Sequence, residues 1–136
     1  MRVLVFGRLP IMQRVTELLR EEGIIVISIS NGFAELIDLL KPDEFSLAIL
    51  DCCAEQTEVA YYRISELGAI PIVFMMSDRR ADWKRIQSLD AIGYLPVQAG
   101  NRELATRLRV ILRHCLTHKQ TEKSNPRHIA YGGPPQ

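Results

Sequence analysis

The sequence predicts an α/β domain in which a parallel β-sheet carries helices on both faces. Two observations support this prediction. Five short apolar runs alternate with segments whose apolar residues recur at helical spacing. The runs are rich in Ile and Val and mostly lack a polar–apolar alternation, which is typical of strands covered on both faces in parallel sheets. A repeated strand–helix order implies right-handed crossovers between parallel strands.

Each element is expected in chain order. We predict strands over the five apolar runs, 3–7, 24–29, 45–50, 70–76 and 92–95. Pro10 suits the first turn of the first helix, and Gly23 suits its end. Asn31 is placed to cap a second helix, which Lys41 and Pro42 close.

Three further helices follow in the second half of the chain. The third is expected over 57–67, the fourth over 80–89 with Asp78 as its cap, and the fifth after Asn101. The apolar periodicity is lost near residue 117. We therefore predict a domain over 1–116 and a flexible tail or linker over 117–136.

Length and composition agree with one domain. The chain has 136 residues, of which 47% are apolar and 24% charged, which suits a buried core and argues against general disorder. No apolar run is long enough to cross a membrane, and the start lacks the features of a signal peptide. Three cysteines, two of them adjacent, do not make a disulfide framework, which indicates a reducing, cytoplasmic setting.

The net charge of +1 hides an uneven distribution. Residues 1–100 hold ten basic and fourteen acidic side chains, whereas 101–136 hold seven basic and two acidic ones. The basic excess fits an anionic partner or, more simply, a solvated helix face. Direct nucleic-acid contact by this chain is not expected, because it would want further basic or aromatic partners from neighbouring elements, and the arginines of the last helix fit solubility, ion pairs or a subunit interface.

Candidate chemistry belongs at the carboxyl ends of the strands, where ligands gather in open α/β sheets. Those ends carry Gly7 and Arg8, Asp51, Ser77 and Val97. The sequence has no glycine-rich phosphate loop, no nucleophile elbow and no paired carboxylates at these ends. We therefore expect no enzymatic activity.

The order and spacing of five segments resemble the receiver domain of two-component response regulators, over about residues 1–116. The segments are 3–10, 31–32, 47–51, 71–75 and 90–95. The resemblance implies a flavodoxin-like (βα)5 fold, a three-layer sandwich with a five-stranded parallel sheet of order 2-1-3-4-5. It also implies that Asp51 lies at the phosphoacceptor position and Tyr94 at the aromatic position used in switching.

The same resemblance exposes departures from an active receiver. Receivers hold Mg²⁺ with two acidic residues that follow the first strand, and here these positions are Gly7 and Arg8. The hydroxyl residue that follows strand four falls on Met76, with Ser77 one place later, and the lysine that follows strand five falls on Val97. Phosphoryl transfer to a carboxylate needs a metal that neutralises the phosphoryl oxygens. We expect a pseudo-receiver without a metal or cofactor.

Arg8 suggests a replacement for the metal. In the receiver fold strands one and three are neighbours, so Arg8 and Asp51 should approach each other, and a guanidinium pairs with a carboxylate in bidentate fashion. The hypothesis is that Arg8 neutralises Asp51 and holds one conformation. The alternative is that Arg8 points into solvent while Asp51 caps a loop.

Other residues have weaker functional interpretations. Cys52 and Cys53 are either small buried apolar residues or a reactive pair whose thiolate Arg8 stabilises. His114 and His118 share a helix face, but one helical turn without further ligands does not predict a metal site. Trp83 either packs in the core or anchors an interface.

Three functions are therefore compared. The first is a cytoplasmic signalling module that acts without phosphorylation on a partner protein or a linked output domain, with a possible homodimer through helix four, strand five and helix five. In receivers this face, which holds Tyr94 and would hold Trp83, carries dimerisation and output docking. The second is a conventional receiver phosphorylated on Asp51. The third is a small-molecule-binding domain with a cleft above strands one and three.

Overall fold

The structure contains the five-stranded parallel sheet that the sequence predicts. The computed structural model describes residues 1–29, 38, 41 and 44–121. Within them, five parallel strands form one sheet in the predicted order β2-β1-β3-β4-β5. The strands are β1 (Arg2–Phe6), β2 (Ile25–Ile29), β3 (Leu47–Asp51), β4 (Ile72–Met76) and β5 (Gly93–Pro96). Every predicted strand boundary lies within two residues of the observed one.

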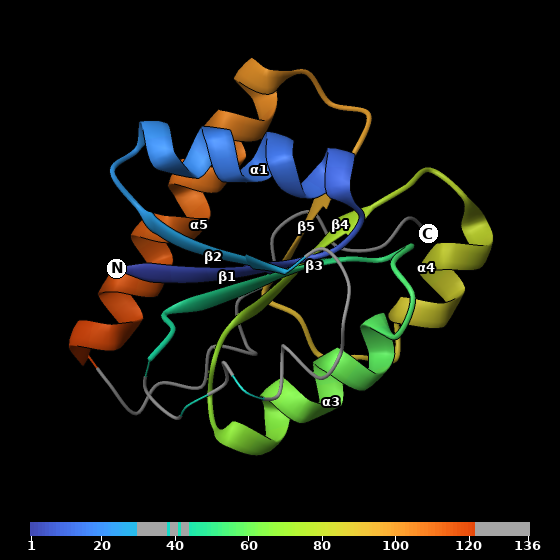
Figure 1. The fold of residues 1–136 in the computed structure, drawn as a ribbon, viewed down its shortest axis with the longest axis horizontal. Helices are drawn as coiled ribbons and strands as arrows, with labels where there is room; N and C mark the ends of the chain where they lie inside the picture. The colour runs from blue at the N-terminus through green and yellow to red at the C-terminus, as the bar shows by residue number, and fades with distance from the viewer. Residues whose placement is uncertain (30–37, 39–40, 42–43, 122–136) are drawn as a thin grey trace.

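Helices cover both faces of this sheet. They are α1 (Leu9–Glu21), α3 (Thr57–Leu67), α4 (Arg80–Ile86) and α5 (Asn101–Thr121). Helices α1 and α5 lie on one face, and α3 and α4 lie on the other (Figure 1). The predicted helix near 31–41 falls outside the described residues, apart from 38 and 41. The flavodoxin-like, three-layer prediction is confirmed.

The sheet divides the apolar interior into two cores. Side chains alternate along β1, so that Val3 and Val5 join the core under α1 and α5, whereas Leu4 and Phe6 join the core under α3 and α4. Strands β3 and β4 are buried along their whole length. This burial explains why their sequences read as continuous apolar runs.

Helix α4 differs from its prediction at both ends. It stops at Ile86 rather than at residue 89, because the Leu89 amide donates to the Ile86 carbonyl at 2.8 Å in a tighter turn, while Leu89 itself stays buried. Asp78 is not its cap. The Ser77 hydroxyl instead accepts a hydrogen bond from the Arg79 amide at 3.1 Å. Serine side chains often accept from the backbone amide two residues later in the chain.

Helix α5 is longer than predicted. It continues to Thr121, past residue 116, where we expected a tail to begin. Residues 117–121 contain no glycine or proline. Because each residue added to an existing helix gains a backbone hydrogen bond without a new nucleation cost, loss of the apolar stripe does not end the helix. Among the described residues, no helix combines the length and the hydropathy needed to cross a bilayer.

Candidate functional site

The centre of the site is the contact between the ends of β1 and β3. Phe6 pairs with Leu50 in the parallel register, so the next residues, Gly7 and Asp51, lie side by side. A Cβ atom placed on Gly7 would lie 2.4 Å from the Cβ atom of Asp51, closer than carbon atoms can approach. Only glycine therefore fits at this position without a shift of the strands. The sequence did not reveal this close approach.

Arg8 and Asp51 form the predicted bidentate ion pair. The Arg8 Nε donates to Asp51 Oδ2 at 2.7 Å, and Nη2 donates to Oδ1 at 3.0 Å. The Asp51 side chain is 2% exposed and the Arg8 side chain is 46% exposed. The hydrogen bond to Asp51 raises the pKa of Arg8 above its ordinary value. Of the alternative, the part in which Arg8 points into solvent is wrong, whereas Asp51 does cap the turn that follows β3, because it also accepts a hydrogen bond from the Cys53 amide.

Backbone groups complete the surroundings of the Asp51 carboxylate. The Arg8 amide donates to Oδ2 at 3.0 Å, and the Cys53 amide donates to Oδ1 at 3.1 Å. The Thr57 hydroxyl donates to the Asp51 carbonyl at 2.6 Å and so fixes the backbone from the start of α3. Each carboxylate oxygen thus accepts two hydrogen bonds, and a buried charge is compensated.

The other predicted pocket residues do not join this pair. Ser77 donates its hydroxyl hydrogen bond to Asp82 on α4. Met76 is buried, and its carbonyl accepts from the Val97 amide at 2.9 Å. The Val97 carbonyl accepts from Arg14 Nη1 at 2.8 Å. The ends of β4 and β5 are therefore held by bonds to α4 and α1.

Sequence reasoning missed two residues of α4 near the site. Asp82 is buried and accepts hydrogen bonds from Ser77 and from the Cys53 thiol, the latter at 3.3 Å. Arg85 donates to the Cys52 carbonyl, and its Nε lies 3.0 Å from Glu58 Oε1 on α3. The signal available was their spacing, since residues three apart share one face of a helix.

Replacing Asp82 with asparagine should reduce stability in a pH-dependent way. The Ser77 hydrogen bond lowers the pKa of Asp82, so its ionised form is favoured by folding. That stabilisation is present above the ordinary Asp pKa and is lost as the pH falls through the lower folded-state pKa. We expect a loss of about 1 kcal/mol at neutral pH, which shrinks below about pH 4. Urea unfolding across this range measures it, and a pH-independent loss would contradict the charge argument.

Tyr94 and Trp83 meet on the α3–α4 side of the sheet. Their ring centroids are 5.0 Å apart at an interplanar angle of 52°. Tyr94 on β5 is 8% exposed, and Trp83 on α4 is half-buried above it. Burial raises the pKa of Tyr94. Trp83 therefore packs on Tyr94 with one part and meets solvent with another, and its role as an interface anchor stays a prediction.

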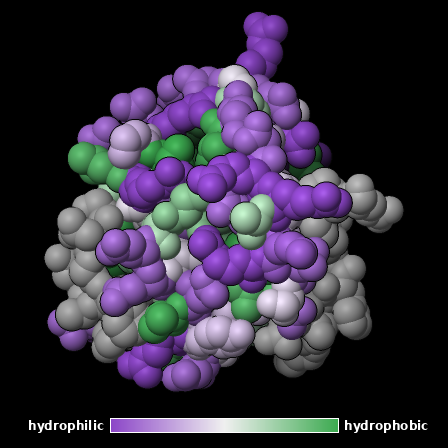
Figure 2. Space-filling view, turned by 90° about the vertical axis from the view of Figure 1, so that its right-hand side faces the viewer, coloured by the Kyte–Doolittle hydropathy of each residue, from purple (hydrophilic) through white to green (hydrophobic). Residues whose placement is uncertain are grey.

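The magnesium site that the receiver fold implies does not fit these residues. Gly7 has no side chain, and the guanidinium of Arg8 lies where a cation would approach Asp51. The ligand atoms of Asp51, Cys52 and Cys53 lie within 4.8 Å of one another. Both Asp51 oxygens are already engaged, however, and a fixed cation repels a divalent ion. Around this end of the molecule, the coloured surface seen from the α4 side is mostly hydrophilic (Figure 2).

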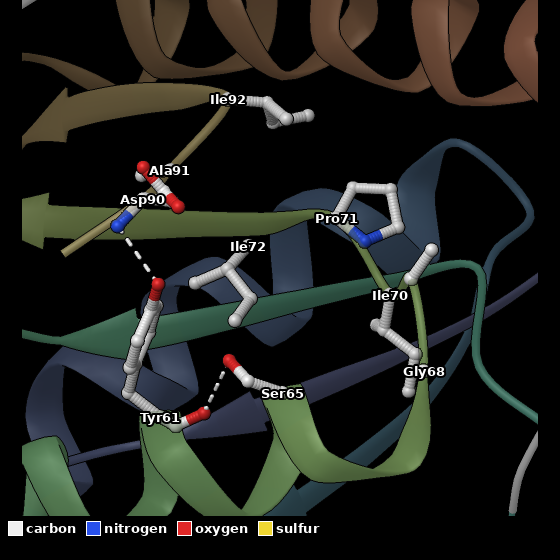
Figure 3. Close-up of a pocket in the computed structure, with 10 residues that line it drawn as sticks. Tyr61, Ser65, Gly68, Ile70, Pro71, Ile72, Asp90, Ala91 and Ile92 are labelled. Atoms are coloured by element: carbon white, nitrogen blue, oxygen red, sulfur yellow. Dashed lines mark hydrogen bonds between the residues drawn. The ribbon is translucent and has the colours of Figure 1, made fainter. Parts of the chain in front are cut away.

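A cavity lies at the other end of the strands, where β4 and β5 begin. It has a volume of about 270 Å³, and its lining runs from the end of α3 to the starts of β4 and β5 (Figure 3). The Tyr61 hydroxyl accepts a hydrogen bond from the Asp90 amide at 2.7 Å at its rim. This position differs from the ligand cleft predicted above β1 and β3, so the cavity does not support that interpretation.

Comparisons with known proteins agree with this architecture. No protein-family description and no curated protein matches the sequence. Among solved structures, the non-phosphorylated receiver domain of HemR from Leptospira biflexa superimposes with a TM-score of 0.69 at 19% identity, over 82% of this chain and 93% of that one. The chain has the receiver fold.

Two further receiver structures extend the comparison. One is the receiver domain of the sensor histidine kinase PA1611 from Pseudomonas aeruginosa, solved with a magnesium ion coordinated in its active-site cleft. It matches with a TM-score of 0.67 at 16% identity, over 85% of this chain and 97% of that one. The other is the N-terminal domain of a response regulator/sensory box/GGDEF protein from Carboxydothermus hydrogenoformans. It matches with a TM-score of 0.66 at 22% identity, over 90% of this chain and 100% of that one.

Proposed function

We propose that this chain is a pseudo-receiver, a non-catalytic signalling domain that acts by protein contact without phosphorylation. One observation carries the proposal. Arg8 binds both carboxylate oxygens of Asp51 through its side chain, and Gly7 provides no acidic group beside it. The fixed guanidinium supplies the positive charge that a metal supplies in an active receiver.

The chemistry of phosphorylation explains why this pair matters. An attacking carboxylate oxygen must be free, and the phosphoryl oxygens need a metal and further cations around them. The PA1611 receiver coordinates magnesium in its cleft. In this chain the Asp51 oxygens are engaged, Ser77 is turned to Asp82, and Val97 stands at the lysine position. A conventional receiver that uses Asp51 is the alternative.

The partner is proposed from the fold. In the Carboxydothermus protein a domain of this fold is the N-terminal part of a response regulator with further domains. We place the contact with a linked output domain, a cytoplasmic partner or a second copy on the face of α4, β5 and α5. Trp83, half-exposed above Tyr94, supplies an aromatic anchor there.

Phosphodonor treatment tests the proposal. With Mg²⁺ and acetyl phosphate, we expect no added phosphoryl mass on the intact protein, and with Mg²⁺ and beryllofluoride we expect no change in Trp83 fluorescence. Trp83 is the single tryptophan and lies on Tyr94, so its emission reports this face. An active receiver treated in parallel checks the reagents.

A Mg²⁺-dependent phosphoryl adduct would overturn the proposal in favour of the conventional receiver, provided that Asp51→Asn abolishes it. An adduct that persists in Asp51→Asn reports modification elsewhere and leaves the Arg8–Asp51 pair as the explanation for an unreactive site.

A further inference from the structure

Two thiols lie side by side in the turn that follows β3. The Sγ atoms of Cys52 and Cys53 are 3.3 Å apart, and all three cysteines of the chain are free. A disulfide bond has an S–S length of about 2.05 Å and usually joins Cα atoms about 4.4–6.8 Å apart, whereas the Cα atoms of adjacent residues are about 3.8 Å apart. Closing the bond therefore requires a change in the peptide between the two residues, and the resulting strain makes the bond easier to reduce. Cys115 lies in the core under α1 and α5, on the other side of the sheet from Cys52.

The two thiols differ in access to solvent. Cys52 is 0% exposed, whereas Cys53 is half-buried and its thiol donates to Asp82 Oδ2 at 3.3 Å. Burial raises the pKa of Cys52 to about 12. A dissolved oxidant therefore reaches Cys53 before Cys52, and Cys52 stays protonated beside it.

We propose that Cys53 and Cys52 form an oxidisable vicinal dithiol, in which a hydroperoxide oxidises Cys53 and Cys52 then closes a disulfide. In the first step the Cys53 sulfur attacks the peroxide, the O–O bond breaks, and the thiol proton leaves with the alkoxide or hydroxide as an alcohol or water. In the second step the Cys52 sulfur attacks the Cys53 sulfenic acid, an S–S bond forms, and water leaves with the Cys52 proton. A thiol reductant reverses the change.

Hydrogen bonds to the backbone of this turn connect the two thiols with Asp51 of the Arg8–Asp51 pair and with α4. The Cys53 amide donates to Asp51 Oδ1, and the Cys52 carbonyl accepts from Arg85 on α4. Closing the ring between adjacent residues reorients the peptide that carries both groups. The proposal is independent of phosphorylation and gives the proposed pseudo-receiver an oxidative input.

Intact-mass spectrometry of the whole chain after hydrogen peroxide treatment tests the proposal. We expect the wild type to lose the mass of two hydrogen atoms, to keep one thiol that is alkylated on unfolding, and to recover both thiols with dithiothreitol. Cys115→Ser should oxidise in the same way, because Cys115 lies in the other core.

Single variants separate the two roles. Cys52→Ser should gain oxygen at Cys53 instead of losing hydrogen, and Cys53→Ser should react at least about tenfold more slowly than the wild type. Circular dichroism establishes that each variant is folded, and Cys52→Ala is the replacement if Cys52→Ser is not. Equal oxidation rates in wild type and Cys53→Ser, or intermolecular dimers in place of the internal disulfide, would overturn the proposal.

Discussion

Replacing Gly7 with alanine should lower the free energy of unfolding by about 2–3 kcal/mol, the upper part of the usual range for forcing extra atoms into a packed interior. The new Cβ would lie 2.4 Å from Asp51 Cβ and 3.1 Å from Asp51 Oδ2. Both atoms belong to Asp51, whose backbone is part of β3 and whose carboxylate is held by Arg8, so a side-chain rotation cannot relieve the clash. Urea unfolding of wild type and variant measures the loss.

Two matched variants make this prediction specific to the contact. Gly100→Ala adds the same methyl group where no atom lies within 4 Å, and should cost less than about 1 kcal/mol. In an Asp51→Gly background the partner Cβ is gone, so the additional cost of Gly7→Ala should fall to a similar level. A loss for Gly7→Ala no larger than that for Gly100→Ala would show that the strands separate easily.

Removing the Arg8 side chain should destabilise the fold by about 2 kcal/mol, as expected for a buried carboxylate that loses a charged partner. The loss should stay below that for a fully buried pair for two reasons. Arg8 is 46% exposed, and the Arg8 and Cys53 amides still donate to Asp51 in Arg8→Ala. Chemical unfolding of Arg8→Ala against wild type gives the value.

A double-mutant cycle isolates the pair. Arg8→Ala, Asp51→Ala and their combination should give a coupling energy of about 1–2 kcal/mol. Arg109→Ala is the control, because its pair with Glu22 has a similar length of 3.1 Å but a carboxylate that is 29% exposed instead of 2%, and exposed pairs contribute under about 1 kcal/mol. A coupling near zero would mean that Arg8 merely covers Asp51.

Most of the fold could be predicted from the sequence because strands buried on both faces leave a strong local signal. β3 and β4 are apolar at nearly every position, and their boundaries were located closely. The ion pair was also within reach, since adjacent strand ends bring Arg8 beside Asp51 whatever the details of packing.

The rest depends on distances between elements, which a linear pattern does not contain. The clash that requires Gly7 arises from the exact separation of β1 and β3. Asp82 reaches Ser77 and Cys53 only because α4 begins where it does, and the sequence had offered Asp78 as the cap instead. Trp83 could not be assigned between core and surface, because it lies across the boundary.

The Arg8–Asp51 pair also bears on how long a signal lasts. An acyl phosphate is lost by hydrolysis, so a phosphorylated receiver resets itself at a rate fixed by its pocket. A guanidinium belongs to the chain and does not decay. If the chain signals as proposed, the lifetime of its signal is set by synthesis and degradation of the protein and by reactions of neighbouring groups such as the Cys52–Cys53 pair. Hydrolysis of a phosphoryl group then plays no part in ending the signal.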